Sequence, residues 1–175
     1  MVREQLARVG ARPKAMLLEP VARGTAPALT LAAVHAVTAD DPVLLVMPSD
    51  HVIAGDQAYR RAVERGAALA RQGHVVAFGV PPSAPETDYG YVRAGRALLA
   101  AEEAEAFYVD EFVEKPGPEA AKAYFDSQSH LYLWNAGIFA VRASVWIEAV
   151  GAFRKEMLAA CERAYRQGRR DGGFL

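Results

Sequence analysis

The run Val43-Leu-Leu-Val-Met47 holds five consecutive apolar residues and is followed directly by Pro48-Ser-Asp-His51. An unbroken apolar run of this length fits a strand that is buried on both faces of a parallel sheet. A helical spacing of apolar residues then covers 57–71, Gly73 ends it, and His74–Val80 is a second apolar run. Strands that alternate with helices are typical of a parallel sheet with helices on its faces, so this stretch predicts an α/β fold.

Both flanks add elements to this core. Upstream, apolar spacing predicts a helix over Val2–Val9, a short strand over Ala15–Leu18 and a helix from Thr25 or Thr30 to Val37. Downstream the alternation ends, and the expected elements are strands over Tyr89–Ala94, Phe107–Val113 and Leu131–Arg142 and helices over Pro118–Phe125, Ser144–Val150 and Lys155–Arg166. The second half therefore predicts antiparallel strands beside the parallel core, which makes the sheet mixed. The 175 residues suit a single domain, and no linker divides them.

Composition narrows the classes of partner. The formal net charge is −1, so there is no excess of basic charge for a nucleic-acid binder that relies on phosphate attraction. The single cysteine, Cys161, excludes an internal disulfide and favours a reduced, cytoplasmic setting. No apolar run is long enough to cross a bilayer, and Arg3 and Glu4 stand where an export signal has its apolar core. We therefore expect neither a nucleic acid nor a membrane as partner.

Polar segments follow the predicted strands, where ligands bind in open α/β sheets. In the loop from Glu19 to Pro27, backbone N–H groups at the start of the next helix can meet a base edge or an anion; the alternative is an ordinary loop in which Thr25 caps the helix. In the second segment, Asp50 offers a carboxylate of the kind that holds Mg²⁺, whereas His51 suits softer metals. The alternatives are the N-cap of a short turn for Asp50 and a packed or surface position for His51.

Three further segments favour a sugar phosphate. In Pro85-Glu-Thr-Asp-Tyr-Gly-Tyr91, Gly90 between aromatic residues allows a ligand ring to approach the backbone, although a bulge at a strand entry is the alternative. Glu114 accepts hydrogen bonds from hydroxyls and Lys115 pairs with phosphate as a compact charge. Asn135 can both donate and accept. Together these side chains suit a phosphorylated sugar.

Taken in order, five motifs resemble those of mannose-1-phosphate guanylyltransferase, of the bacterial type that is often fused to a mannose-6-phosphate isomerase domain. The motifs are Glu19-Pro-x-x-Arg-x-Thr-Ala-Pro-Ala28, Pro48-Ser-Asp-His51, Glu86-Thr-x-Tyr-Gly-Tyr91, Phe112-Val-Glu-Lys-Pro116 and Trp134-Asn-x-Gly-Ile-Phe139. The resemblance covers essentially the whole chain. It implies a Rossmann-like, GT-A-like nucleotidyltransferase fold of three layers with a mixed sheet. It also implies that mannose 1-phosphate attacks the α-phosphate of GTP to give GDP-mannose and pyrophosphate.

The resemblance also implies roles for nine residues. Asp50 would be the Mg²⁺ ligand and, with Lys115 on the sugar phosphate, would serve catalysis; the nucleotide would lie against Glu19, Arg23, Thr25 and Ala26, and the mannose against Gly90, Glu114 and Asn135. Three positions depart from the family pattern. Asp88 replaces a glycine, Gly24 an asparagine and Ala136 a serine. Asp88 adds a negative charge near phosphates, which is unfavourable if it points inward.

The family usually opens with a strand and a glycine-rich loop that holds the triphosphate, and neither is found here. A later acidic metal ligand and the isomerase domain are also absent. We therefore expect residues 1–175 to be a partial nucleotidyltransferase domain, with unpaired backbone groups that cost about 1–3 kcal/mol each and little or no turnover of GTP. Two alternatives stay open: the same chemistry with another sugar 1-phosphate or base, and a non-catalytic sugar-nucleotide sensor or regulatory subunit. The sequence does not decide whether the chain forms a homo-oligomer.

Overall fold

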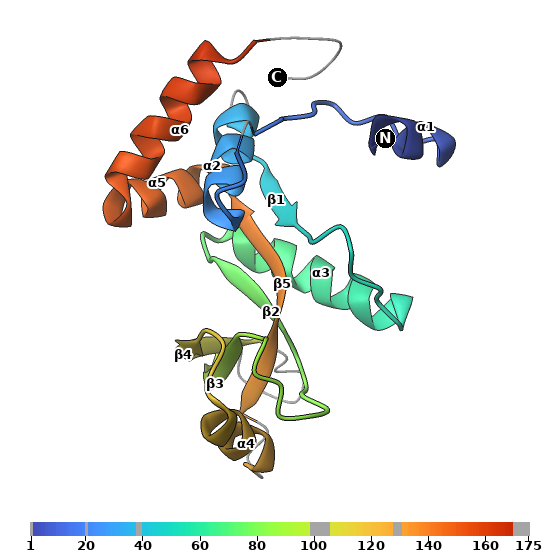
Figure 1. The fold of residues 1–175 in the computed structure, drawn as a ribbon, viewed down its shortest axis with the longest axis vertical. Helices are drawn as coiled ribbons and strands as arrows, with labels where there is room; N and C mark the ends of the chain where they lie inside the picture. The colour runs from blue at the N-terminus through green and yellow to red at the C-terminus, as the bar shows by residue number, and fades with distance from the viewer. Residues whose placement is uncertain (1, 20, 38–39, 99–105, 128–130, 170–175) are drawn as a thin grey trace. The chain divides into compact units, whose positions relative to one another are not determined.

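The computed structural model describes residues 2–19, 21–37, 40–98, 106–127 and 131–169 (Figure 1). These residues form six helices and five strands: α1 (Val2–Arg8), α2 (Thr25–Ala36), β1 (Val43–Val46), α3 (Asp56–Arg71), β2 (Val76–Val80), β3 (Tyr91–Ala97), β4 (Phe107–Val113), α4 (Pro118–Asp126), β5 (Tyr132–Arg142), α5 (Ala143–Phe153) and α6 (Lys155–Gln167). Among the described residues, no helix has the length and apolar character that a membrane span requires.

The chain divides into two compact units. Unit 1 comprises Met1–Leu44, Ala70–Val75 and Val141–Leu175, and unit 2 comprises Leu45–Leu69 and Val76–Ala140. The prediction that the 175 residues make a single domain stays a prediction.

Unit 1 is built on three helices, α2, α5 and α6, which pack against one another and lie side by side in Figure 1. Polar side chains join these helices. The Trp146 indole N–H donates to Thr30 Oγ1 (3.0 Å), and a ring nitrogen of His35 lies 2.9 Å from the Tyr165 hydroxyl. Thr30 is fully buried, and its hydroxyl also donates to the Ala26 carbonyl (2.7 Å), so its polar atom is satisfied.

Cys161 of α6 is buried in this helical contact, 3.9 Å from the Pro27 carbonyl oxygen. Burial and, to a smaller extent, the nearby negative charge of Glu19 raise the pKa of its thiol. Because the thiolate is the reactive form, we expect exchange of this thiol with a disulfide reagent at pH 8 to be roughly 10- to 100-fold slower than in the unfolded chain. Rates measured with a chromogenic disulfide, with and without guanidinium, check this; equal rates would contradict it.

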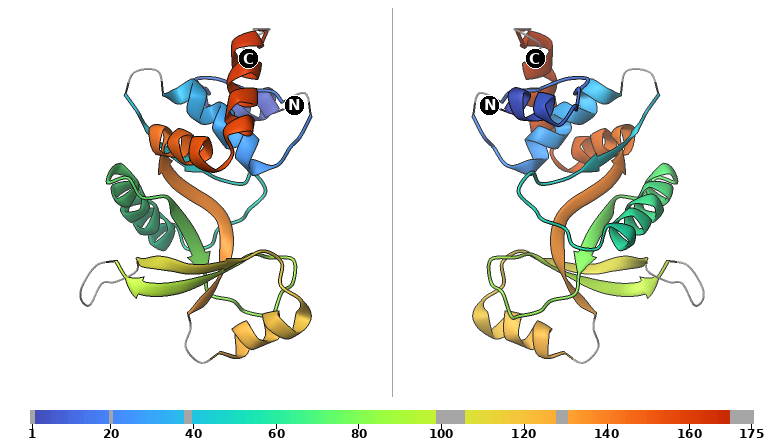
Figure 2. Two further views of the ribbon diagram at one scale, coloured as in Figure 1. Left: turned by 90° about the vertical axis from the view of Figure 1, so that its left-hand side faces the viewer. Right: turned by 90° about the vertical axis from the view of Figure 1, so that its right-hand side faces the viewer.

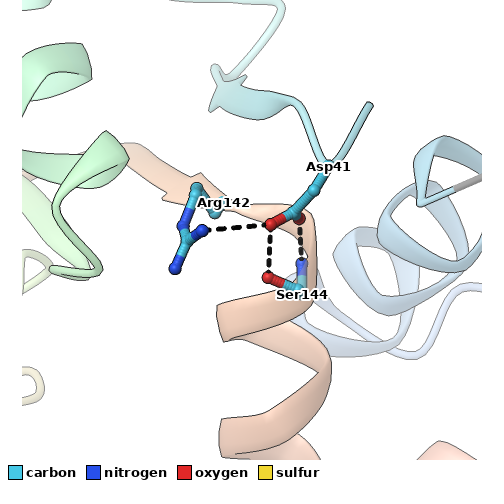
Figure 3. A network of polar contacts seen from close by, with 3 residues as sticks. All are labelled: Asp41, Arg142 and Ser144. Carbon is cyan, nitrogen blue, oxygen red and sulfur yellow. Dashed lines mark hydrogen bonds and ion pairs between the residues drawn. The ribbon is translucent and has the colours of Figure 1, made fainter. Parts of the chain in front are cut away.

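Asp41 holds the start of α5 (Figure 3). One of its carboxylate oxygens accepts the Ser144 backbone N–H (2.8 Å); the other accepts the Ser144 hydroxyl (2.6 Å) and lies 3.3 Å from the Arg142 guanidinium. The backbone of Asp41 is left-handed (φ 43°), a conformation that aspartate and asparagine tolerate better than most residues. A carboxylate at a helix N-terminus also interacts favourably with the helix dipole.

This arrangement predicts a dependence of stability on pH. The hydrogen bonds from Ser144 and, less strongly, the charge of Arg142 lower the pKa of Asp41 below 3.8. A lowered pKa in the folded state stabilises the fold above the unfolded pKa, and the contribution is lost as the pH falls through the folded pKa. We expect Asp41→Asn to lower the melting temperature by roughly a few degrees above about pH 5, and the gap from wild type to narrow as the pH falls below 3.8.

Melting curves of both proteins from pH 7 to pH 2 test this prediction. The matched control is Asp126→Asn, which removes an exposed carboxylate paired with Lys122 on α4 and should change little. A gap for Asp41→Asn that stays constant across the whole pH range would show that ionisation of Asp41 does not matter.

Unit 2 contains the antiparallel strands. β3 pairs with β4 (Tyr91 opposite Val113) and with β5 (Tyr91 opposite Trp134), and β2 pairs with β5 (Val80 opposite Trp134). The strand order of the sheet is β1-β5-β3-β4, with β2 also on β5, so β5 is its central strand and β4 an edge. Figure 2 shows the β3–β4 hairpin and α4 near the start of β5.

Aromatic rings attach α4 to this sheet. Tyr124 of α4 stacks on Tyr132 of β5, with ring centroids 4.1 Å apart, and lies 5.4 Å from the ring of the fully buried Tyr91 of β3. Desolvation of Tyr124 raises the pKa of its phenol, with smaller contributions from Tyr132 and Glu111. These ring contacts attach the C-terminal half of α4 to the sheet.

The antiparallel pairs β3–β4 and β3–β5 confirm the expectation for the second half of the chain. Other expectations need correction. β1 and β2, expected in a parallel core, each pair with β5 instead, and the pair β2–β5 is antiparallel. The run Val43–Met47 is not buried on both faces, because Leu45 is 39% and Met47 50% exposed. The expected strand Ala15–Leu18 is reduced to a bridge at Met16. An apolar run predicts extended backbone but does not identify its partner, and β5 follows β1 only much later in the chain.

Candidate active site

Three residues that were predicted to contact the sugar lie together in unit 2. A Cβ atom on Gly90 would lie 3.1 Å from Glu114 Oε2, 3.1 Å from Phe112 Cζ and 3.6 Å from Asn135 Cβ. The Asn135 backbone N–H donates to the Gly90 carbonyl (2.8 Å). We name Gly90, Phe112, Glu114 and Asn135 the Gly90 cluster. Gly90 is buried, so the absence of a side chain there leaves the Glu114 carboxylate and the Cβ atom of Asn135 close to the backbone of Gly90.

The side-chain amide of Asn135 is oriented by a hydrogen bond to its oxygen. The Gly137 N–H donates to Asn135 Oδ1 (3.2 Å), which identifies the oxygen, and no described residue bonds the Nδ2 group. Glu114 is exposed and likewise has no hydrogen-bond or ion-pair partner among the residues that the structure describes. An ionised carboxylate only accepts and an amide NH₂ only donates. The cluster therefore offers one acceptor and one donor to a hydroxylated ligand.

Lys115 follows the cluster with an unusual backbone. Its φ is 46°, in the left-handed region, and the next residue, Pro116, is buried. Left-handed backbone costs a residue with a side chain roughly 1–2 kcal/mol, and such strain is concentrated at functional sites. The Lys115 side chain is exposed, with no ion pair to another described residue. A cation thus stands next to the carboxylate of Glu114 in sequence, where a phosphate on the sugar would need it.

The segment that carries Asp50 lies against β5. A Cβ atom on Gly137 would lie 3.3 Å from Pro48 Cγ and 4.0 Å from His51 Cε1. Pro48-Ser-Asp-His51 therefore runs beside Gly137, two residues after Asn135. Asp50 and His51 are both exposed. This segment was predicted from the sequence to carry a Mg²⁺ ligand, but its contact with β5 was not predicted.

Aromatic residues border the Gly90 cluster. The ring of Tyr89 meets that of Trp134 edge to face, with centroids 5.1 Å apart, and Phe112 belongs to the cluster itself. No individual role was predicted for Phe112, Trp134 or Gly137. The available signal was a glycine inside an apolar strand pattern, which often marks a bulge or a close backbone approach.

The four residues that were predicted to contact the nucleotide lie in unit 1, before or at the start of α2. Glu19 is half-buried, Arg23 and Thr25 are exposed, and Ala26 lies within the first turn. The alternative in which Thr25 caps the helix is wrong, because Gly24 (φ 88°) is the N-cap and no side chain bonds the first turn. The N–H groups there have no side-chain cap, and such groups bind anions in many proteins.

The candidate ligand for Mg²⁺ is the carboxylate of Asp50. Among the described residues, no three His, Cys, Asp or Glu side chains gather into a preformed metal cage. Mg²⁺ is commonly held by one or two carboxylates together with substrate phosphates and water. The exposed carboxylate of Asp50 fits that mode, in which the substrate completes the coordination, and does not fit a site built from protein ligands alone.

Comparison with known proteins decides the family. The family model described as nucleotidyl transferase matches residues 1–175. The chain belongs to the nucleotidyl transferase family. This transferase domain is 46% identical over 175 residues to the xanthan biosynthesis protein XanB of Xanthomonas campestris pv. campestris (strain B100), covering 99% of this chain and 36% of that protein. It is 45% identical over 169 residues to the mannose-1-phosphate guanylyltransferase ManC of Salmonella typhimurium. That match covers 95% of this chain and 35% of ManC.

The transferase domain spans about a third of the length of these curated relatives. Among solved structures, a crystal structure described as mannose-1-phosphate geranyltransferase from Thermus thermophilus matches with a TM-score of 0.78 and 35% identity, covering 95% of this chain and 48% of that one. The expected nucleotidyltransferase fold is therefore confirmed, as is the resemblance to mannose-1-phosphate guanylyltransferases.

Proposed function

We propose that this chain forms part of a mannose-1-phosphate guanylyltransferase, with GTP and mannose 1-phosphate as substrates and GDP-mannose and pyrophosphate as products. The observation that carries the proposal is the Gly90 cluster, in which Glu114 Oε2 comes within 3.1 Å of the Cβ position of Gly90 and Asn135 within 3.6 Å. A carboxylate and an amide beside an exposed lysine suit a sugar that carries hydroxyls and one phosphate. A cytoplasmic location fits the single reduced cysteine.

In the proposed reaction, an oxygen of the mannose phosphate forms a bond to the α-phosphorus of GTP. The bond from this phosphorus to the oxygen that bridges it to the β-phosphate breaks, and pyrophosphate leaves. No general base is needed, because the attacking phosphate is already an anion. Glu114 accepts from a mannose hydroxyl, Asn135 donates to another, and Lys115 pairs with the phosphate. Asp50 would hold Mg²⁺, which neutralises charge on the phosphates when bound. The residues act by positioning and charge, as phosphoryl-type transfers require.

For the nucleotide we propose the loop before α2. The uncapped N–H groups of its first turn suit a base edge or a phosphate oxygen, and Arg23 is exposed beside them. The half-buried carboxylate of Glu19 suits the N–H donors of a guanine edge. Weak competition by UTP or dTTP in a GTP-binding assay would support guanine recognition, and equal competition would contradict it.

Calorimetry and an assay of pyrophosphate release test the function. Mannose 1-phosphate should bind more tightly than mannose, which lacks the phosphate, and than glucose 1-phosphate, which differs at one hydroxyl. Pyrophosphate should be released with GTP and Mg²⁺. Binding of GDP-mannose without any pyrophosphate release would favour a sugar-nucleotide sensor, and no binding of any sugar phosphate would refute the proposed site.

A further inference from the structure

We propose that Gly137 is a positioning residue, which fixes the amide of Asn135 as a donor to the sugar and seats the Pro48–His51 segment beside it. The inference rests on the mannose 1-phosphate site proposed above. It concerns two neighbours of Gly137, its own strand residue Asn135 and the segment that carries Asp50. Both contacts lie within unit 2.

The backbone at Gly137 requires glycine. Its φ is 66°. Ala77 of β2 pairs with Phe139 and Gly79 with Asn135, so β5 uses more residues than β2 over the same stretch and forms a bulge that contains Gly137. A residue with a Cβ atom would have to adopt left-handed backbone inside a strand. Such a residue is disfavoured there, whereas glycine adopts this conformation readily.

This conformation turns the Gly137 N–H toward the side chain of Asn135. The bond to Asn135 Oδ1 (3.2 Å) occupies the oxygen of the amide, so the NH₂ group is the end left for a ligand. An amide without this bond could present either end, and the flipped orientation would place an oxygen where a donor is needed. Glu114 already supplies the acceptor, so a fixed donor completes a pair that distinguishes two hydroxyls.

The missing side chain of Gly137 also makes room for a neighbouring segment. A methyl group there would lie 3.3 Å from Pro48 Cγ and 4.0 Å from His51 Cε1. The distance to Pro48 is shorter than most Cβ contacts in proteins. The segment that ends at His51 would have to move by a few tenths of an ångström. Since Asp50 lies between Pro48 and His51, the same glycine influences the placement of the proposed Mg²⁺ ligand.

Nuclear magnetic resonance of the ¹⁵N-labelled chain tests the orientation without any ligand. Asn135→Ala should speed hydrogen exchange of the Gly137 amide about tenfold or more, because its acceptor is lost. Asn135→Asp keeps an acceptor and should leave that exchange slow. Equal exchange rates in wild type and Asn135→Ala would overturn the proposal.

Ligand titrations complete the test. Asn135→Asp should weaken mannose 1-phosphate binding about tenfold to a hundredfold, because the donor becomes an acceptor. Gly137→Ala should weaken it about tenfold. The control is Gly10→Ala, which meets a similar backbone cost (φ 73°) with nothing within 4 Å and should bind as wild type does.

The two proposals fail in different ways. If Gly137→Ala binds mannose 1-phosphate as tightly as Gly10→Ala, the positioning role is wrong although the proposed function stands. If the wild-type chain binds no sugar phosphate, the proposed function fails, and with it the role of Gly137 toward the sugar.

Discussion

Gly90→Val is expected to reduce the affinity for mannose 1-phosphate by about a hundredfold or more. The first carbon of the new side chain would lie 3.1 Å from both Glu114 Oε2 and Phe112 Cζ, so both groups must shift by a few tenths of an ångström, and the added methyl groups take further space beside the carboxylate. Loss of a hydrogen bond to a charged acceptor, together with steric exclusion, accounts for an effect of this size. Calorimetry with mannose 1-phosphate measures it directly.

The stability of this variant must be separated from its binding. Overpacking costs about 1–3 kcal/mol, so Gly90→Val should also melt earlier. Gly95→Val on the same strand is the matched control, because its Cβ atom would collide with the side chain of Asp110, outside the cluster. We expect Gly95→Val to lose stability and keep its affinity. Equal affinity of Gly90→Val and wild type would show that the sugar does not bind beside Gly90.

Lys115→Gly is expected to weaken mannose 1-phosphate binding by roughly 10- to 100-fold while making the chain more stable than Lys115→Ala. Both variants remove the cation, but only glycine adopts φ 46° without the steric cost of a Cβ atom. The difference in unfolding free energy should be about 1 kcal/mol in favour of glycine. Thermal melts compare the two variants.

Binding of mannose and of mannose 1-phosphate is also compared for both variants. If Lys115 pairs with the phosphate, both variants should lose affinity for mannose 1-phosphate and retain whatever affinity they have for mannose. A loss of the same size for both ligands would place Lys115 against the sugar ring instead. Equal stabilities of the glycine and alanine variants would show that the left-handed backbone carries no strain.

The sequence predicted individual elements better than their pairing. Most helices and strands were expected within a few residues, because apolar spacing and glycines such as Gly73 mark local structure. The antiparallel pairing of β2 was not expected, because β1 and β2 both meet β5, which follows much later in the chain. A local pattern contains no information on a partner at that distance.

The sugar-binding residues were predicted in part. The chemical types of Glu114, Lys115 and Asn135 indicated a sugar phosphate, and the structure brings Glu114 and Asn135 together around Gly90. Gly137 was not singled out, because its importance depends on a left-handed φ and on the nearness of Pro48, which only the folded chain reveals. The roles of all nine site residues stay predictions until ligands are tested.

The edge strand β4 has a consequence for how the protein behaves at high concentration. Phe107, Tyr108, Val109 and Phe112 are all substantially exposed on a strand at the border of the described sheet. Such edges recruit strands from other molecules and seed aggregates. Asp110 and Glu111 interrupt the apolar residues at the middle of the strand, and both lie near Arg93 of β3. Repulsion between these carboxylates on neighbouring molecules opposes intermolecular sheet growth, so β4 combines an aggregation-prone edge with acidic gatekeeper residues.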